Sequence, residues 1–498
     1  GRKAWEGWVP FYNLYVWNKI LGKPWWWLFL MLVPGINLLM LIVMNVNTSI
    51  VFGERAVKDH MMMAFFPWVK LPQLAYQEKF KYVGPIPVEQ RKRGLVGQWG
   101  DAILFAVIVA TVFRTFTFEA FTIPTPSMEK SLLVADYLFV SQRSYGPRMP
   151  MTPITFPFTH HTIPLLNCQS FVTWFNQPYK RLPGFGKPQH GDAVVFNFPE
   201  GDTVLQYFQN QSYYQLLRDN GRKKVWDDRF TKENEVDGVR KPYPMGHVLV
   251  RPIDKQENYI KRCVATAGDT LEVRDGYVYV NGVKEKFPTY AQFGYEMGVK
   301  VKSLNDRSWD ILKDRYDISK QDFGYADGPG VNIAMTAEQL TMMEKGNPFF
   351  NSPKRQNHPH DYNRGSKLPY FPNDTAFHWS EDNYGPIWIP KAGIDVKLNL
   401  QNLPLFRRLI TVYENHTLEV KNGVIHIDGV ATDHYTVEQD YYWLMGDNRH
   451  RSQDARFWGY VPFDHVVGKA VMVWLTADPE KGGFPRGIRW KRLFSKVR

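Results

Sequence analysis

Ser127 lies in a proline-rich segment, Ile123–Met128, with the sequence IPTPSM. The two prolines restrict the backbone that leads to the serine, and a helical turn is predicted over Met128–Leu133. Backbone N–H groups at the start of a helix favour an anion. The position therefore suits a nucleophile whose own N–H stabilises an oxyanion, although a lone serine is more often inert.

A serine nucleophile needs a base, and Lys261 is the best candidate. The chain has 13 histidines, but none lies in a Ser–His pattern such as G-x-S-x-G, so a neutral lysine is the alternative. In a predicted strand, Tyr259, Lys261 and Cys263 share one face. Apolar surroundings would lower the pKa of the lysine. The alternative is that Lys261 is an ordinary solvated cation, because the chain has 61 lysines and arginines.

A third polar segment, Trp443–Ala470, contains many hydrogen-bonding groups in a short stretch. Acids, bases and hydroxyls alternate in it, which indicates a fixed polar network. The plain alternative is a surface turn. The residues concerned are Gly446, Asp447, Asn448, Arg449, Ser452, Asp454 and Arg456.

The part of the chain after about residue 118 is rich in strand signals. Turn dipeptides, Asn281–Gly282 and Asn422–Gly423, predict hairpins, and 336–345 predicts a short helix. Several short strands with turn signals indicate a sandwich or barrel-like domain. Strands are predicted over 136–140, 192–197, 270–273 and 277–280.

Three apolar segments precede these strands. Residues 25–46 are long enough to span a bilayer, which needs about 20 apolar residues, but Pro34 and Gly35 predict a kink or a hairpin. Residues 61–76 contain Lys70 and fit a helix on the surface about as well. The third segment, 94–121, follows the basic run 91–93, which marks a cytoplasmic flank.

The segment 94–118 is therefore predicted to be a transmembrane anchor that places the rest of the chain outside the cytoplasm. The formal net charge of +12 then indicates contact with a membrane rather than with nucleic acid. Two cysteines, Cys168 and Cys263, are too few for a disulfide framework, and the sequence leaves open whether they pair.

Four segments, in this order, resemble bacterial type I signal peptidases. They are I-P-[S/T]-x-S-M at Ile123–Met128, the strand Ala135–Val140, Y-I-K-R-x-V-x-x-x-G-D at Tyr259–Asp269, and G-D-N-R-x-x-S-x-D-x-R-x-x-G at Gly446–Gly459. The last is highly specific. The GKPWWW segment at 22–27 looks like the extra membrane region of Bacteroidetes-type members, a weaker resemblance.

The resemblance implies a role for each matching residue. Ser127 is expected to be the nucleophile and Lys261 the general base. Thr125 and the N–H of Ser127 are expected to form the oxyanion hole, and Ser452 to orient Lys261. Structural support is expected from Asp454 and Arg456 as a pair, with Asp447, Asn448, Arg449 and Met128. Neither a metal nor an organic cofactor is expected.

The sequence departs from the family pattern at a few positions. Ala135 replaces the usual glycine, and Ala455 replaces the usual serine of D-S-R. Ala265–Thr266–Ala267 replaces a segment in which a proline usually precedes the Gly–Asp pair. None of these changes removes a proposed catalytic group.

The expected fold is a mainly β catalytic domain of two antiparallel sheets with N-terminal transmembrane helices and mixed insertions. The N-terminal membrane region, 1–93, is expected to have one or two spans, and the anchor follows at 94–118. The remaining divisions are a catalytic domain at 119–146, 187–200, 259–283 and 410–478, insertions at 147–186, 201–258 and 284–409, and a basic tail at 479–498.

The expected activity is the removal of signal peptides from exported preproteins by a serine endopeptidase of the bacterial inner membrane, with its catalytic domain on the periplasmic side. The expected partners are signal peptides, the lipid bilayer and the export translocon. Two alternatives stay open: a soluble self-cleaving Ser–Lys regulator, and an inactive scaffold of the export apparatus.

Overall fold

The computed structural model describes residues 2–31, 36–85, 95–156, 159–163, 166, 168–209, 211–227, 229–236, 239–301, 303–324, 330–360, 368–478, 481–482 and 487–497. The chain divides into two compact units. One contains Gly1–Phe116 and Arg148–Lys180, and the other contains Thr117–Pro147 and Arg181–Arg498.

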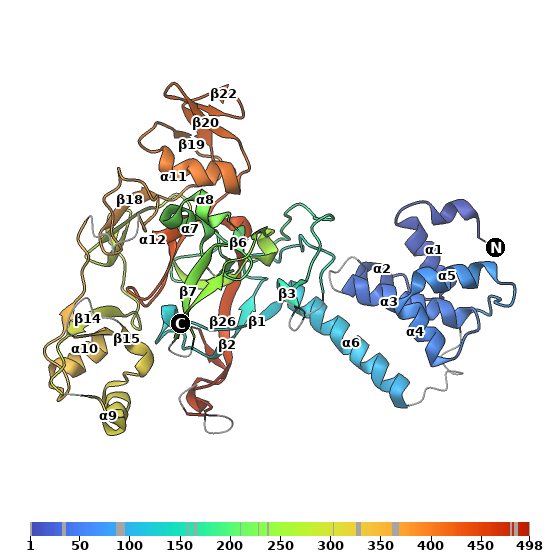
Figure 1. Cartoon of the computed structure of the whole chain (residues 1–498), viewed down its shortest axis with the longest axis horizontal. Helices are drawn as coiled ribbons and strands as arrows, with labels where there is room; N and C mark the ends of the chain where they lie inside the picture. The colour runs from blue at the N-terminus through green and yellow to red at the C-terminus, as the bar shows by residue number, and fades with distance from the viewer. Residues whose placement is uncertain are drawn as a thin grey trace. The chain divides into compact units, whose positions relative to one another are not determined.

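The first unit is mainly helical, and its N-terminal helices are drawn in blue in Figure 1. Its core includes Leu21, Met44 and Val51. A small two-stranded sheet joins β3 (Thr162–Ile163) to β4 (Cys168–Gln169). The helices are η1 (Ala4–Gly7), α1 (Tyr12–Ile20), α2 (Trp27–Leu30), α3 (Ile36–Val51), α4 (Val57–Phe65), α5 (Pro67–Tyr76) and α6 (Leu95–Phe116).

The segment 61–76 is not one continuous helix, because Pro67 starts a new helix after Phe66. The segment forms parts of α4 and α5, which meet at Pro67. The ammonium of Lys70 is buried and lies 2.7 Å from Glu54 and 3.0 Å from Asp59. A buried cation needs such partners, so this lysine belongs to the packing of the unit.

The predicted membrane spans gain no support from these helices. Helix α6 covers the expected anchor, and 32–35 and the basic flank 86–94 lie outside the described residues. Within the described part of the chain, no helix is both long and apolar enough to cross a bilayer.

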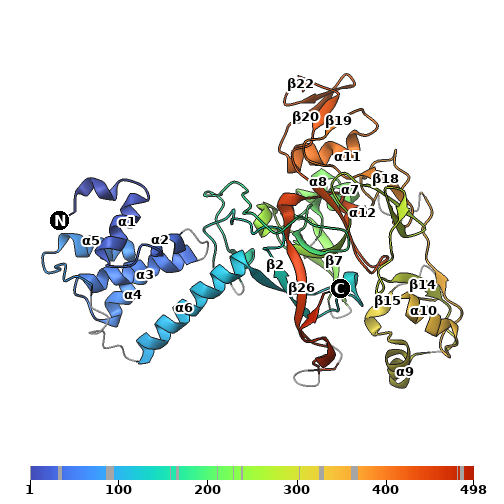
Figure 2. The same cartoon turned by 180° about the vertical axis from the view of Figure 1, so that it is seen from behind.

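The second unit is built on an eight-stranded antiparallel sheet, seen from both sides in Figures 1 and 2. The long strand β26 pairs with β2, β5 and β27. The order is β1 (Phe118–Thr122), β2 (Asp136–Ser141), β26 (Val466–Thr476), β5 (Ala193–Asn197), β10 (Asn258–Ala265), β24 (Tyr441–Met445) and β25 (Val461–Pro462), with β27 (Ser495–Lys496) on β26.

Both faces of this sheet are buried near its middle. Along β5, Ala193 and Val195 belong to one hydrophobic cluster, whereas Val194 and Phe196 belong to another. Side chains alternate between faces along a strand, so β5 is covered on both sides. Strand β10, which carries Lys261, pairs with β5.

Smaller sheets surround this central sheet, which corrects the expectation of only two sheets. One has the order β13 (Val283–Lys284), β12 (Tyr277–Val280), β11 (Thr270–Arg274) and β18 (Tyr384–Trp388). Another has the order β15 (Phe323–Gly324), β16 (Val331–Met335), β14 (Phe293–Met297) and β17 (Lys354–Arg355). The second of these packs with α9 (Asp306–Tyr316) and α10 (Ala337–Glu344) around its own core.

The remaining elements are short. Strand pairs and a three-stranded sheet comprise β6 (Thr203–Leu205) with β9 (Val248–Val250), β7 (Thr231–Val236) with β8 (Val239–Pro244), β19 (Asp395–Lys397) with β23 (His434–Thr436), and β20 (Leu418–Lys421) with β21 (Val424–Ile427) and β22 (Val430–Ala431). The helices are α7 (Tyr213–Asn220), α8 (Arg222–Val225), α11 (Leu403–Arg408), α12 (Ala455–Trp458), η4 (Ile253–Lys255), η5 (Lys320–Asp322), η6 (Leu409–Tyr413), η7 (Phe463–His465) and η8 (Trp490–Arg492).

Local sequence signals predicted several of these elements correctly. The strands β2, β5, β11 and β12 lie where they were predicted. At the two hairpins, Asn281 and Gly282 have φ of 51° and 80°, and Asn422 and Gly423 have φ of 50° and 79°. Positive φ at both central residues is the requirement of a type I′ turn.

The basic C-terminal tail packs on the second unit. Arg492 ion-pairs with the buried Asp136 at 2.5 Å. Arg489 donates a hydrogen bond to the carbonyl of Val134 at 3.0 Å. The positive charges of these two residues therefore neutralise an acid at the start of β2.

Ala135 has a left-handed backbone with φ of 63°, which explains why glycine is usual there. An L-residue in this region costs about 1–2 kcal/mol relative to glycine. We expect Ala135→Gly to raise the free energy of unfolding by about 0.5–1 kcal/mol, since the entropy of the freer unfolded chain offsets part of the gain. Chemical denaturation measures this change.

The control is Ala337→Gly, at the start of α10, which should lower the free energy of unfolding because glycine weakens a helix. Destabilisation by both substitutions would show that the backbone at Ala135 is not strained.

Candidate active site

Ser127 lies in a short turn that the polar loop after β24 holds in place. The turn is the 3₁₀ helix η3, Pro126–Met128, and not the expected helical turn over 128–133. The backbone N–H of Asn448 donates to the carbonyl of Ser127 at 3.1 Å. The side-chain amide of Asn448 donates to the carbonyl of Pro126 at 3.2 Å. Two hydrogen bonds from one residue thus fix the backbone on which Ser127 stands.

Lys261 comes to Ser127 from the middle of the sheet. Its Nζ donates to Ser127 Oγ at 2.6 Å, and its side chain is buried in the unit. Burial lowers the pKa of Lys261 to about 8, while the negative charges of Asp454 and Asp447 partly oppose that shift. The amine is therefore within reach of its neutral form near physiological pH, in which it can accept the serine proton.

Arg262, the residue after Lys261, connects the strand to the polar loop. Its guanidinium is bidentate on the buried carboxylate of Asp447, with Nε–Oδ1 at 2.8 Å and Nη2–Oδ2 at 2.6 Å. Because neighbouring residues on a strand point to opposite faces, Arg262 is turned away from the face that presents Lys261. Arg262 was not among the predicted site residues, although its position directly after Lys261 in the Y-I-K-R segment could have indicated it.

Asp454 and Arg456 form a second buried ion pair, with Nη2–Oδ2 at 2.8 Å. Asp454 also accepts from the backbone N–H of Gly446 at 3.0 Å. Arg456 donates to the carbonyl of Arg449 at 2.7 Å. The pair therefore fixes the backbone on both sides of Asn448, at Gly446 and at Arg449.

Arg449 belongs to the same loop, and its side chain is buried. Burial lowers the pKa of its guanidinium to about 10, and the guanidinium stacks over the ring of Phe287 at 5.3 Å. The Arg449 N–H donates to the carbonyl of Gln292 at 2.9 Å. These contacts join the loop to the segment that leads into β14.

The two remaining hydroxyls differ in how they relate to the dyad. Thr125 Oγ1 is 3.5 Å from Ser127 Oγ, so it lies beside the serine hydroxyl. The hydroxyl of Ser452 donates to the carbonyl of Gln453 at 3.4 Å. Among the described residues, the structure shows no hydrogen bond between Ser452 and Lys261, so the expected contact is not formed.

Met128 is fully buried and packs in the cluster that also contains Ile123 and Leu132. Its thioether chain anchors the segment after Ser127 in the core.

A cavity of about 580 Å³ opens elsewhere on the unit, lined by residues that include His190, Arg262, Tyr290 and Arg449. Neither Ser127 nor Lys261 lines it. The cavity is therefore separate from the contact between Ser127 and Lys261.

Comparison with known proteins identifies the family. Residues 96–323 and 395–475 match the family described as "Signal peptidase, peptidase S26". The chain belongs to this signal peptidase family. It is therefore a peptidase, a hydrolase of peptide bonds. Residues 5–85 separately match a family of unknown function, DUF5684.

Several curated relatives carry the name signal peptidase I. The relative from Buchnera aphidicola (subsp. Acyrthosiphon pisum) is 43% identical over 79% of this chain and 80% of its own length. The relative from Haemophilus influenzae is 23% identical over 78% of this chain and 73% of its own length. The relative from Helicobacter pylori is 22% identical over 78% of this chain and 89% of its own length.

Gly446 lies close against Ser127 and Ser452. A Cβ atom there would lie 2.2 Å from Ser452 Oγ and 2.7 Å from the carbonyl oxygen of Ser127. We expect Gly446→Ala to displace the Ser127 turn, to lower the free energy of unfolding by about 1–3 kcal/mol and to reduce peptidase activity by at least about tenfold.

Gly186→Ala is the matched control, because a Cβ atom at Gly186 meets nothing within 4 Å. Peptide cleavage and thermal unfolding of the two variants provide the measurement. Full activity of Gly446→Ala would mean that the close approach does not position Ser127.

Proposed function

We propose that this member of the signal peptidase family removes signal peptides from exported preproteins with Ser127 as nucleophile and Lys261 as base. The observation that supports this most is the 2.6 Å contact between Lys261 Nζ and Ser127 Oγ. The amine is buried, which favours its neutral form. A serine hydroxyl beside a neutral amine is the arrangement that a Ser–Lys peptidase requires.

In the proposed cycle, Lys261 takes the hydroxyl proton as Ser127 Oγ attacks the scissile carbonyl carbon. The C–N bond of the resulting tetrahedral intermediate breaks, the leaving amine takes the proton from Lys261, and an ester to Ser127 remains. Lys261 then takes a proton from water as its oxygen attacks the ester carbonyl carbon, the C–O bond to Ser127 breaks, Ser127 Oγ takes the proton back from Lys261, and the carboxylic acid product leaves. All proton transfers use the chain's own residues.

The oxyanion of each tetrahedral intermediate needs hydrogen-bond donors. We propose the N–H of Ser127 and the hydroxyl of Thr125 for this role, since Thr125 Oγ1 lies 3.5 Å from Ser127 Oγ. Asn448 fixes the backbone of the turn by donating hydrogen bonds to the carbonyls of Ser127 and Pro126. A donor on a fixed backbone loses little energy to reorganisation during the reaction.

The substrate is proposed to bind as an extended strand. Strand β1 lies at the edge of the central sheet and leads through Ile123 and Pro124 directly to Ser127. A peptide can extend a sheet at such an edge by backbone hydrogen bonds. This would bring the bond to be cut to the nucleophile, with small side chains before the cut in shallow pockets.

Of the two alternatives, the self-cleaving regulator is less well supported, because the S26 family match includes the segments of both Ser127 and Lys261. The inactive scaffold is separated from the enzyme by an activity measurement.

Replacement of either dyad residue should abolish cleavage. We expect Ser127→Ala and Lys261→Ala to reduce cleavage of a synthetic signal peptide by at least about a thousandfold. Lys261→Arg should be equally inactive, because a guanidinium stays protonated. Detergent-purified full-length protein is assayed by mass spectrometry of the products.

The controls are Ser131→Ala, a serine four positions after the nucleophile, and Lys421→Ala, an exposed hairpin lysine. Both should cleave like the unmodified chain. Near-full activity of Lys261→Ala would assign the base to another residue, and an inactive but folded unmodified chain would favour the scaffold.

The pH dependence follows from the pKa of Lys261, which burial lowers to about 8 from 10.5. Below pH 8 the amine is protonated and cannot accept the serine proton, so kcat/KM should rise with pH and level off above about 8. An activity that falls between pH 7 and 9, or that does not change, would contradict a neutral lysine base.

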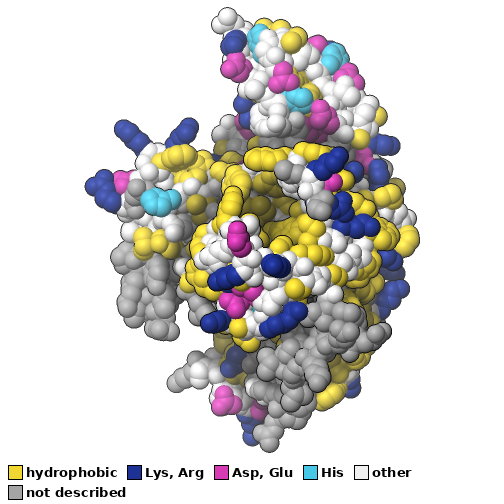
Figure 3. Space-filling model, turned by 90° about the vertical axis from the view of Figure 1, so that its right-hand side faces the viewer, with side chains coloured by type: hydrophobic (Ala, Val, Ile, Leu, Met, Phe, Trp, Pro, Cys, Tyr) yellow, Lys and Arg dark blue, Asp and Glu magenta, His cyan; other side chains and the backbone are white. Residues whose placement is uncertain are grey.

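We further propose that the chain is attached to the bacterial cytoplasmic membrane with the catalytic unit on its outer side. The helical unit exposes large aromatic side chains, among them Trp8 at 87%, Phe11 at 75%, Trp68 at 68% and Tyr76 at 87%. Yellow hydrophobic side chains also gather on the face drawn in Figure 3. Aromatic rings favour the membrane interface, and the net charge of +12 favours anionic lipid.

Flotation with vesicles of phosphatidylethanolamine and phosphatidylglycerol tests this attachment. The full chain should float, and joint replacement of Trp8, Phe11, Trp68 and Tyr76 by Asn should reduce the floated fraction several-fold. Phe185→Asn with Trp226→Asn, two exposed aromatics of the other unit, is the control. Equal flotation of both variants would show that these helical aromatics do not carry the attachment.

A further inference from the structure

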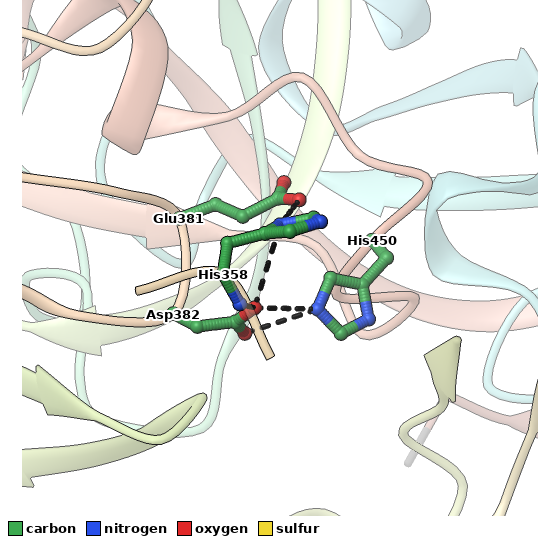
Figure 4. Close-up of side chains that lie close together, drawn as sticks. All are labelled: His358, Glu381, Asp382 and His450. Carbon is green, nitrogen blue, oxygen red and sulfur yellow. Dashed lines mark hydrogen bonds and ion pairs between the residues drawn. The ribbon is translucent and has the colours of Figure 1, made fainter. Parts of the chain in front are cut away.

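Four buried side chains with metal-binding chemistry meet outside the dyad. His358, Glu381, Asp382 and His450 each offer one ligand atom, and these atoms lie within 4.8 Å of one another. His358 Nδ1 is 2.6 Å from Glu381 Oε1 and 3.5 Å from Asp382 Oδ2. Figure 4 shows the imidazole of His358 beside both carboxylates, with His450 facing Asp382.

The two carboxylates are buried, with side-chain exposures of 4% for Glu381 and 1% for Asp382. Each already contacts an imidazole, Glu381 that of His358 and Asp382 that of His450. Imidazole nitrogens and carboxylate oxygens that are gathered out of water are ligands for a divalent transition metal.

The geometry points to a site for one divalent transition-metal ion of the zinc type, bound by His358 Nδ1, Glu381 and Asp382. Imidazole and carboxylate are ligands that zinc accepts at about 2.0–2.2 Å. Two ligand atoms of a tetrahedral ion therefore lie about 3.4 Å apart. The separation from His358 to Asp382 already fits, and the shorter contact with Glu381 has to open by under about 1 Å.

His450 is assigned a supporting role by its hydrogen bonds. The N–H of Gly294 donates to His450 Nδ1 at 2.9 Å, so a neutral ring carries its proton on Nε2. That nitrogen lies 2.9 Å and 3.0 Å from the two oxygens of Asp382. His450 thus holds the carboxylate of Asp382, and hydrogen bonds of this kind orient metal ligands.

The cluster is ordered by its backbone as well. The N–H of His358 donates to Asp382 Oδ2 at 2.8 Å, and Ser380 Oγ donates to the carbonyl of His358 at 2.6 Å. The ligands come from two segments far apart in sequence. Because these hydrogen bonds fix the relative positions of the two segments without an ion, the entropy cost of binding an ion is reduced.

An ion at this position would hold the catalytic loop. His450 follows Arg449 directly, and Asn448, which fixes the Ser127 turn, is two residues away. Arg456 donates to the carbonyl of Glu381 at 3.1 Å. Metal binding would therefore connect residues 358–382 to the loop that supports the dyad. The role is structural, and it is independent of the proposed peptidase mechanism.

Metal content and thermal unfolding of the full-length protein test the site. Detergent-purified chain is treated with a chelator, re-equilibrated with Zn²⁺ and freed of excess metal. We expect about one zinc per chain by mass spectrometry, and a midpoint of unfolding that falls on chelation and returns with zinc. Neither readout depends on peptidase activity.

Variants locate the ion. His358→Ala and Asp382→Asn should each weaken zinc binding by at least about a hundredfold, and His450→Ala by about ten- to a hundredfold. The control is His416→Ala, because His416 also lies between two carboxylates, Asp428 at 2.6 Å and Glu438 at 3.0 Å, but near the surface. It should leave the content of buried zinc unchanged.

Two results would overturn the proposal. One is unmodified protein that retains no zinc and unfolds at the same temperature with and without it, which would leave a metal-free His–carboxylate network. The other is folded His358→Ala that retains zinc like the unmodified chain. If the variants do not fold, the chelation and recovery of the unmodified chain alone decide.

Discussion

The structure of the second unit depends on keeping the amine of Lys261 away from water and beside the hydroxyl of Ser127. A pKa that is lowered from 10.5 to about 8 corresponds to roughly 3 kcal/mol of unfavourable burial for the charged form. The fold must supply this free energy. It does so by placing β10 inside a sheet with apolar clusters on both faces, so that water cannot solvate the ammonium.

The polar loop after β24 acts through both backbone hydrogen bonds and side-chain ion pairs. Asn448 fixes the turn of Ser127, while Asp447 and Asp454 hold Arg262 and Arg456 in buried ion pairs. Such pairs add little net stability, but the loss of one partner is costly because it leaves a buried charge alone. The density of charged residues in this loop is therefore explained by geometry, since each pair fixes a position of the chain near the dyad.

Local signals predicted more of this structure than long-range ones did. The strands β2, β5, β11 and β12 and the two Asn–Gly turns follow from alternation and backbone preference. The roles expected of Ser127 and Lys261 came from their local motifs and from a family resemblance. The expected contact of Ser452 with Lys261 did not form, and the turn at Ser127 is shorter than expected. The cluster of His358, Glu381, Asp382 and His450 was not foreseen, because its members are distant in sequence and no spacing links them.

The alternation of β10 has a consequence for how this chain can vary. Lys261 and Arg262 are neighbours that face opposite sides, and Lys261 is paired in register with Val194 of β5. A slip of one residue would exchange the two faces and present to Ser127 a guanidinium that never gives up its proton. Long additions between strands leave this phase intact, whereas a single residue inserted before Lys261 within β10 would reverse it. Insertions are thus tolerated in the loops, whereas a one-residue insertion or deletion before Lys261 within β10 is not.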